Sequence, residues 1–217
     1  MLIGPPGAGK STLAKAVQEQ MPEANLISVS SYMDVGVTLI ERDKMKGYGH
    51  MTDYLDNIFA YDGELWFNID REARDRHTLA IAGLNNRGGL YRDSIFAEIA
   101  LRAMKQGIPN ILGNVPKLGS VKELIKQGVY AIGLECDEQE RFRRRLENLR
   151  KDDPKDEKLL IEQMRRTDEL LEETLSVEWL KGVEGDSGGK TARVFDTYEI
   201  GSTNSVIIQY ALDVLRK

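Results

Sequence analysis

A glycine-rich stretch near the start of the chain constrains its fold more than any other feature. The stretch fits the pattern G-x-x-x-x-G-K-[ST] at every fixed position, and apolar Met1-Leu2-Ile3 precede it. A helical pattern follows from Ser11 to about Gln20, before Pro22. We therefore expect a strand, a tight loop and a helix in that order. The loop comprises Gly4, Pro5, Pro6, Gly7, Ala8, Gly9, Lys10, Ser11 and Thr12.

Each residue type in this loop has a task in holding phosphate. Glycines let the backbone bend and approach an anion without an intervening Cβ atom. Successive N–H groups form an anion-binding nest, and the helix that follows points its positive end at the same place. Lys10 can reach the β- and γ-phosphates, and the Ser11 hydroxyl suits Mg²⁺. The alternative is a plain strand-to-helix turn, but the complete match favours a site for ATP and Mg²⁺.

Strand and helix patterns alternate along the rest of the chain, which predicts an α/β fold with a parallel sheet. A polar, aromatic-rich segment interrupts them and predicts a small helical subdomain. Its aromatic side chains could pack a nucleobase, but a core of their own is the favoured interpretation. The expected strands lie at 24–30, 110–117, 130–136 and 192–196, the expected helices at 92–106, 119–127, 137–150, 156–181 and 203–215, and a glycine-rich loop at 182–190.

Composition narrows the class of protein. A chain of 217 residues with 41% hydrophobic residues can form one domain. Its net charge of −5 argues against a general nucleic-acid surface, and it has no apolar run long enough for a bilayer. The single cysteine, Cys136, falls in an apparent buried strand and is expected to be an inert core thiol. We expect a cytoplasmic enzyme, monomeric or homodimeric, that acts on a small molecule.

The order of these elements resembles the adenylate kinase branch of the nucleoside monophosphate kinases. The resemblance rests on the loop, on Gly113-Asn114-Val115-Pro116-Lys117 in the place of the family's Asp-Gly-Phe-Pro-Arg signature, on the arginines after residue 137, and on Ile200-Gly201-Ser202-Thr203. It implies a three-layer P-loop NTPase fold over residues 1–217, with a five-stranded parallel sheet of order 2-3-1-4-5. It also implies a helical acceptor-binding insert at 33–89 and a short arginine-bearing lid at 145–166.

The departures from that family concern the acceptor side. The signature aspartate is Gly113 here, and the signature arginine is Lys117, which keeps the charge but loses the bidentate fork. The subdomain arginine that would hold the acceptor's phosphate falls at Asp34, a reversal of charge. Binding of donor ATP therefore carries over from the family, whereas binding of AMP does not.

Candidate site residues follow from the loop and the resemblance together. Arginines of the lid are expected to stabilise transition-state charge, although a solvated face paired with Glu138, Glu140 and Glu147 is an alternative for the same helix. Asp34 is a candidate for holding Mg²⁺ through water, or a helix-entry residue. The catalytic candidates are Lys10, Lys117, Arg145, Arg150 and Arg166; the acceptor-binding candidates are Ser30, Asp34, Arg87, Gly113 and Lys117; the adenine candidates are Gly201 and Ser202; and the metal ligand is Ser11.

Three functions remain open on the sequence alone. The first is ATP-dependent phosphorylation of a nucleoside monophosphate. The second keeps this chemistry but replaces the acceptor by another metabolite, because Asp34 and the 113–117 turn differ from the family. The third is a catalytically reduced module that binds ATP and acts through a change of shape. A GTPase switch is disfavoured, because no Asn-Lys-x-Asp stretch is found.

Overall fold

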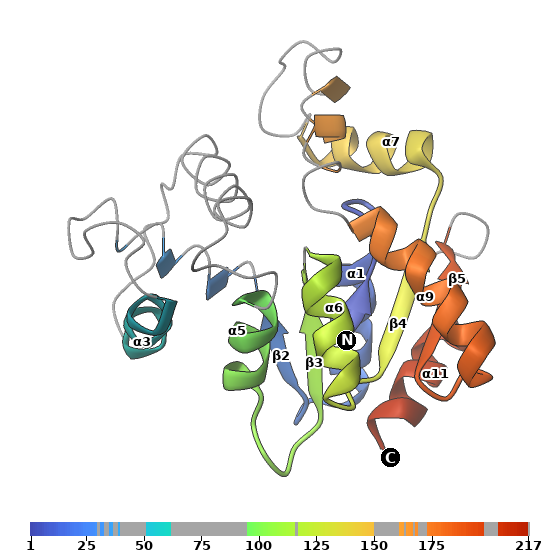
Figure 1. The fold of residues 1–217 in the computed structure, drawn as a ribbon. Helices are drawn as coiled ribbons and strands as arrows, with labels where there is room; N and C mark the ends of the chain where they lie inside the picture. The colour runs from blue at the N-terminus through green and yellow to red at the C-terminus, as the bar shows by residue number, and fades with distance from the viewer. Residues whose placement is uncertain are drawn as a thin grey trace.

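The computed structural model places five strands and seven helices among the residues that it describes (Figure 1). The described residues are 1–29, 31–32, 35–36, 39, 51–61, 95–115, 117–149, 161–162, 164–166, 168, 173–197 and 204–216. The strands are β1 Leu2–Ile3, β2 Asn25–Ser28, β3 Asn110–Gly113, β4 Ala131–Glu135 and β5 Ala192–Asp196, and the helices are α1 Lys10–Gln20, α3 Met51–Ala60, α5 Ile95–Ala103, α6 Leu118–Lys126, α7 Glu138–Leu149, α9 Glu173–Ser187 and α11 Ser205–Leu215.

Every strand pair is parallel, as the alternating pattern predicted. The expected single five-stranded sheet is wrong for these residues. Hydrogen bonding produces a three-stranded sheet of order β1-β4-β5 and a separate two-stranded sheet of β2 and β3. β1 contacts β3, but the two residues of β1 form their ladder with β4, Leu2 opposite Ile132 and Ile3 opposite Gly133. So short a strand has few backbone groups with which to join the two sheets.

Helices cover both faces of the strands, which gives three layers (Figure 1). α5, α6 and α9 lie on one face, where α9 contacts β4 and β5 and α6 contacts both of its neighbouring helices. α1 and α11 contact each other on the opposite face. This arrangement explains the continuous apolar runs of the strands, because a strand covered on both faces needs no polar alternation.

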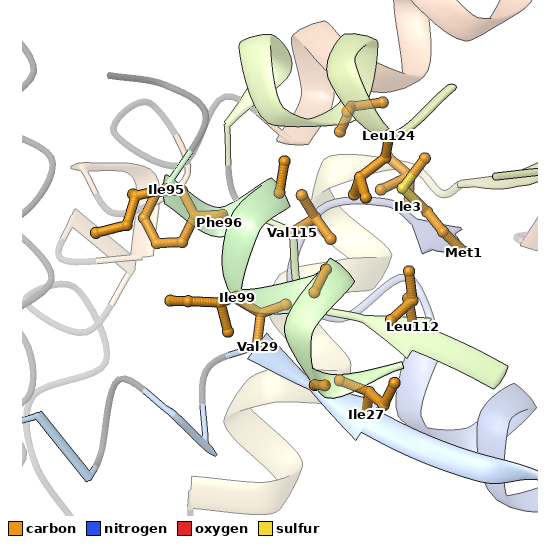
Figure 2. Close-up of a cluster of buried hydrophobic side chains, with 14 of the residues drawn as sticks. Met1, Ile3, Ile27, Val29, Ile95, Phe96, Ile99, Leu112, Val115 and Leu124 are labelled. Carbon is orange, nitrogen blue, oxygen red and sulfur yellow. The ribbon is translucent and has the colours of Figure 1, made fainter. Parts of the chain in front are cut away.

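The larger core lies between the strands and α5 and α6 (Figure 2). Ile3, Ile27 and Leu112 come from three different strands and meet Phe96 and Ile99 of α5 in one cluster. All five are almost fully buried. Burying a side chain of this size contributes about 1.5–3 kcal/mol. The cluster therefore fixes β2 and β3 beside β1 even though no backbone ladder joins the two sheets.

α3 is the described helix of the predicted insert at 33–89, and it confirms helical character for residues 51–60. Leu55 and Ile58 are buried in the same core as α5. Arg102 of α5 also donates a hydrogen bond to Asp56 over 2.8 Å. Phe59 packs against this core and against Tyr32, with 4.8 Å between ring centroids. Among the described residues, the aromatic side chain of Phe59 therefore has a packing role, in the core that it shares with α5.

One predicted loop is helical. Residues 182–187 belong to α9, which continues beyond the expected end at Lys181. Val183 packs against the core, and the Glu184 carboxylate accepts a hydrogen bond from the Val194 N–H over 2.9 Å. The helix ends where Gly188 and Gly189 adopt left-handed φ angles of 58° and 78°. Tertiary contacts thus override the low helix propensity of glycine.

Two glycines allow a matched test of packing. A Cβ atom on Gly4 would lie 2.5 Å from the Leu134 carbonyl oxygen, whereas one on Gly185 would meet no described residue within 4 Å. We expect Gly4→Ala to lower the free energy of unfolding by about 1–3 kcal/mol, because the backbone at Gly4 or at Leu134 must move to make room for the methyl group. Gly185→Ala should raise it by about 0.5–1 kcal/mol. Urea unfolding measures both, and equal effects would contradict the assigned contact.

Candidate nucleotide-binding site

The loop between β1 and α1 has the backbone geometry that its glycines predicted. Gly7 and Gly9 have φ angles of 88° and 96°, in the left-handed region that glycine adopts readily. The Ala8 N–H donates to the Pro5 carbonyl over 3.1 Å and closes a turn. α1 begins directly after Gly9, with neither a capping side chain nor an acidic residue in its first turn. The first N–H groups of a helix have no intrahelical acceptor, so this end suits an anion.

Lys10 lies over the loop rather than in solvent. The residue is 7% exposed, and its ammonium group donates a hydrogen bond to the Gly4 carbonyl. Ser11 and Thr12 follow in the first turn of α1 and are exposed. The loop therefore brings a cation, a hydroxyl group and a helix N-terminus to one place, which is the combination that holds a polyphosphate and its Mg²⁺.

The structure corrects part of the role expected for the glycines. Gly4 packs against β4, and Gly7 packs against α7, where an added Cβ atom would lie 2.8 Å from the Arg141 carbonyl oxygen. These two positions therefore require glycine because protein backbone approaches them, independently of any ligand. No signal in the sequence indicated that the loop would be enclosed by the segment after β4.

Thr197, which directly follows β5, supports the loop through its side-chain hydroxyl group. Its side chain is fully buried, and its hydroxyl group lies 3.1 Å from the Ala8 carbonyl oxygen and 2.9 Å from that of Glu135. The sequence analysis did not single out this residue. Its position directly after an apolar strand was the available signal, because the carboxyl ends of parallel strands gather at one edge.

The arginines of α7 divide between the loop and solvent. Arg144 donates to the Gly7 carbonyl over 3.4 Å and to the Thr197 carbonyl over 3.1 Å. Arg143 is exposed and pairs with Glu140 and Glu147. Hydrogen bonds from Arg143 and then Arg144 lower the pKa of the Glu140 carboxyl to about 2. The solvated-face interpretation is therefore confirmed for Arg143, whereas a role of these arginines in stabilising transition-state charge stays a prediction.

A buried ion-pair cluster joins α7 to the helical residues near 165. The Asp168 carboxylate lies 3.0 Å from Arg145 and 2.5 Å from Arg141, which the sequence analysis did not select. Phe142, Leu146 and Met164 form a small hydrophobic cluster of their own beside these charges. Arg145 thus lies inside a packed unit near the loop, whereas the expected catalytic partner Arg166 is exposed.

The carboxyl edge of β2 and β3 carries a second polar group of residues. Asn114 has a φ angle of 58°, rare for a residue with a side chain, and its amide donates to the Ser28 hydroxyl over 3.1 Å. Lys117 directly precedes α6 as its N-cap residue and is 8% exposed. Gly113 ends β3, where an added Cβ atom would meet, among the described residues, only the Ile27 carbonyl oxygen at 4.0 Å. Packing against those residues therefore does not explain the absence of an aspartate at position 113.

Several predicted residues lie outside the described part of the chain, so the structure places none of them. This group comprises the acceptor candidates Ser30, Asp34 and Arg87, the lid candidate Arg150, and the adenine candidates Gly201 and Ser202.

Two further expectations concern the described residues. Cys136 is 7% exposed, and burial raises the pKa of its thiol, consistent with the inert role expected for it. Within the described ranges, no three His, Cys, Asp or Glu side chains gather in a way that could hold a metal ion, and no helix has the length and apolar character needed to cross a membrane.

Comparison with known proteins matches the loop region. A family model described as "ATPase family associated with various cellular activities (AAA)" matches residues 1–60, which include β1, the loop and α1. A search of curated proteins found no match to the chain. The match and the loop geometry agree on a P-loop nucleotide-binding unit. Neither the match nor the loop geometry shows that the chain belongs to the adenylate kinase branch.

Removal of the Thr197 hydroxyl group tests the support of the loop. We expect Thr197→Val to lower the free energy of unfolding by about 1–2 kcal/mol, because carbonyls of the loop and of β4 lose a buried donor. Thr197→Ser keeps the hydroxyl group and should recover most of the hydrogen-bonding contribution. Urea unfolding of both variants gives the comparison, and a valine variant as stable as the serine variant would contradict this role.

Proposed function

We propose that the chain binds MgATP through residues 4–12 and transfers the γ-phosphoryl group to a small acceptor, with a nucleoside monophosphate as the first candidate. The observation that carries the proposal is the position of α7. Its residue Arg144 contacts the phosphate-binding loop at Gly7, and Arg141 of the same helix contacts the loop at Pro6. Phosphoryl transfer requires such positive charge around the transferring group.

The residues of the loop would hold the donor. Backbone N–H groups of the loop and the first turn of α1 would donate to the phosphates, and Lys10 would exchange its contact with the Gly4 carbonyl for a phosphate oxygen. Ser11 is exposed at the end of the helix where Mg²⁺ would bind. Bound Mg²⁺ supplies charge neutralisation between the β- and γ-phosphates.

The acceptor would lie at the carboxyl edge of β2 and β3. Ligands bind at this edge in open α/β folds. Buried Lys117 would supply positive charge to an acceptor phosphate, and the pair of Ser28 and Asn114 supplies polar groups beside it. Ser30, Asp34 and Arg87 remain predicted contributors from the insert. The reversed charge at Asp34 also supports an acceptor other than AMP, including a metabolite whose hydroxyl group needs a base.

ATP hydrolysis without an acceptor, or regulated ATP binding, is the second candidate. Two observations favour it: the family model that matches residues 1–60 describes ATPases, and β3 ends in Gly113 although no described residue crowds a Cβ atom added there. A module of this kind would use the same loop and the same arginines as a kinase. It would either transfer the γ-phosphoryl group to water or keep ATP bound without turnover.

A transfer assay separates these functions. Purified protein is incubated with MgATP and each nucleoside monophosphate, then with a panel of phosphorylated and hydroxylated metabolites, while ADP and free phosphate are measured in parallel. We expect ADP formation that depends on one acceptor, without an equal amount of free phosphate. Equal ADP and phosphate would indicate hydrolysis, and neither product despite ATP binding would favour the regulatory module.

Two lysines of α1 provide a matched pair for the same assay. We expect Lys10→Met to reduce turnover by at least about 100-fold, because a charge-assisted contact to the transferring phosphates is lost. Lys15 is exposed on the same helix, and Lys15→Met should retain wild-type turnover. Comparable losses in both variants would show that the effect does not arise at the loop.

A further inference from the structure

Arg141 is an almost fully buried cation in contact with the nucleotide loop. The residue is 6% exposed, and its guanidinium donates to the Pro6 carbonyl over 3.3 Å. Its backbone meets the loop as well, since a Cβ atom on Gly7 would lie 3.2 Å from the Arg141 Cα atom. The packing of Gly7 therefore fixes where this guanidinium lies.

The hydrogen bonding of this guanidinium is incomplete. One terminal nitrogen, Nη1, accounts for its contacts with Pro6 and Asp168, whereas the Nε–H group is buried without a hydrogen-bond partner among the described residues. An arginine has five N–H donors in a fixed planar arrangement. A buried donor without a partner costs free energy, so a structure that retains one often binds a further group there.

Asp168 supplies the negative charge that the arginines require. One of its carboxylate oxygens lies 2.5 Å from Arg141 and the other lies 3.0 Å from Arg145, so one carboxylate bridges two guanidinium groups. The carboxylate side chain is only 11% exposed. Like this carboxylate, a phosphate group is anionic and accepts paired hydrogen bonds from guanidinium groups.

We propose that Arg141 binds a phosphate group of the nucleotide held by the loop, and that Asp168 is the counterion of Arg141 and Arg145 when no nucleotide is bound. The inference rests on nucleotide binding at residues 4–12, as proposed above, but not on the identity of any acceptor. Binding of the polyphosphate supplies the missing acceptor for the guanidinium and shares the charge that Asp168 alone compensates. Nucleotide binding is thereby coupled to the contact between α7 and the helical residues near 168.

Calorimetric titration of wild type and three variants tests this assignment, with inorganic tripolyphosphate, MgATP and adenosine as separate probes. Arg141→Met should weaken tripolyphosphate and MgATP binding by about tenfold or more, because a charge-assisted contact is lost. Adenosine binding should not change. Arg143→Met is the matched control: it removes an exposed arginine of the same helix, which pairs with Glu140 and Glu147, and should bind all three probes like wild type.

Asp168→Asn tests the counterion role and remains informative if the Arg141 variant fails to fold. It should lower the thermal midpoint of the ligand-free protein, because two buried guanidinium groups lose their carboxylate. It should also bind tripolyphosphate several-fold more tightly than wild type, because the polyanion then replaces the missing charge. A merely structural role for Asp168 would lower stability without tightening the binding of phosphate.

The outcomes distinguish this inference from the proposed function. If wild type binds MgATP but transfers phosphate to no acceptor, the transfer function fails while the binding comparison stands. If wild type and Arg141→Met bind tripolyphosphate equally, or if Asp168→Asn binds it less tightly, the assignment of Arg141 and Asp168 is overturned whether or not transfer occurs.

Discussion

The site depends on the hydrogen bonds that protein side chains donate to the carbonyl groups of the phosphate loop. The Gly4, Pro6, Gly7 and Ala8 carbonyls each accept a hydrogen bond from a side chain, respectively from Lys10, Arg141, Arg144 and Thr197. A trans peptide unit is planar, so its C=O and the following N–H point in opposite directions. These contacts fix the peptide units that carry the Gly7 and Gly9 N–H groups, whereas Pro5 has no N–H group and the Ala8 N–H donates to the Pro5 carbonyl. The protein side chains thus hold the loop backbone in place before any anion binds.

Three of those donors come from elements that lie far from the loop in sequence. Arg141 and Arg144 belong to α7, and Thr197 follows β5. β4 and β5 run parallel and pair along their whole length, so the segments after their carboxyl ends meet at the edge where the loop lies. The parallel ladder is therefore what assembles the site, and the charges on α7 act on the loop because β4 delivers them there.

The sequence predicted the loop, the five strands and the helical pattern of α1, α5, α6, α7 and α11 with small errors at their ends. These features are local: glycine at tight turns, apolar periodicity and helix-ending residues fix them. The extent of α9 was not predictable in this way, because Gly182 and Gly185 indicate a loop, whereas Val183 and Glu184 make tertiary contacts that favour the helix. The split between the two sheets depends on which neighbour a two-residue strand pairs with.

The candidate site was predictable where a residue acts through its own position in a motif, as Lys10 and Ser11 do. It was not predictable where the role depends on a partner distant in sequence. Five arginines between 141 and 150 look alike in the sequence, yet Arg141 contacts the loop, whereas Arg143 is exposed and pairs with Glu140 and Glu147 of its own helix. Asp168, which pairs with Arg141 across 27 positions of the chain, had no local signal at all.

The small cluster of Phe142, Leu146 and Met164 has a consequence for cooperativity. It is separate from the two larger cores, so α7 and the helical residues that contain Met164 form a local folding unit with little buried apolar surface of its own. Units of this kind open at a lower free energy than the global fold. Because the same helix carries the donors to Pro6 and Gly7, each local opening also releases the loop. The fraction of time for which the phosphate loop keeps its bound shape is therefore set by the local stability of the unit that contains α7. The stability of the sheet does not set it.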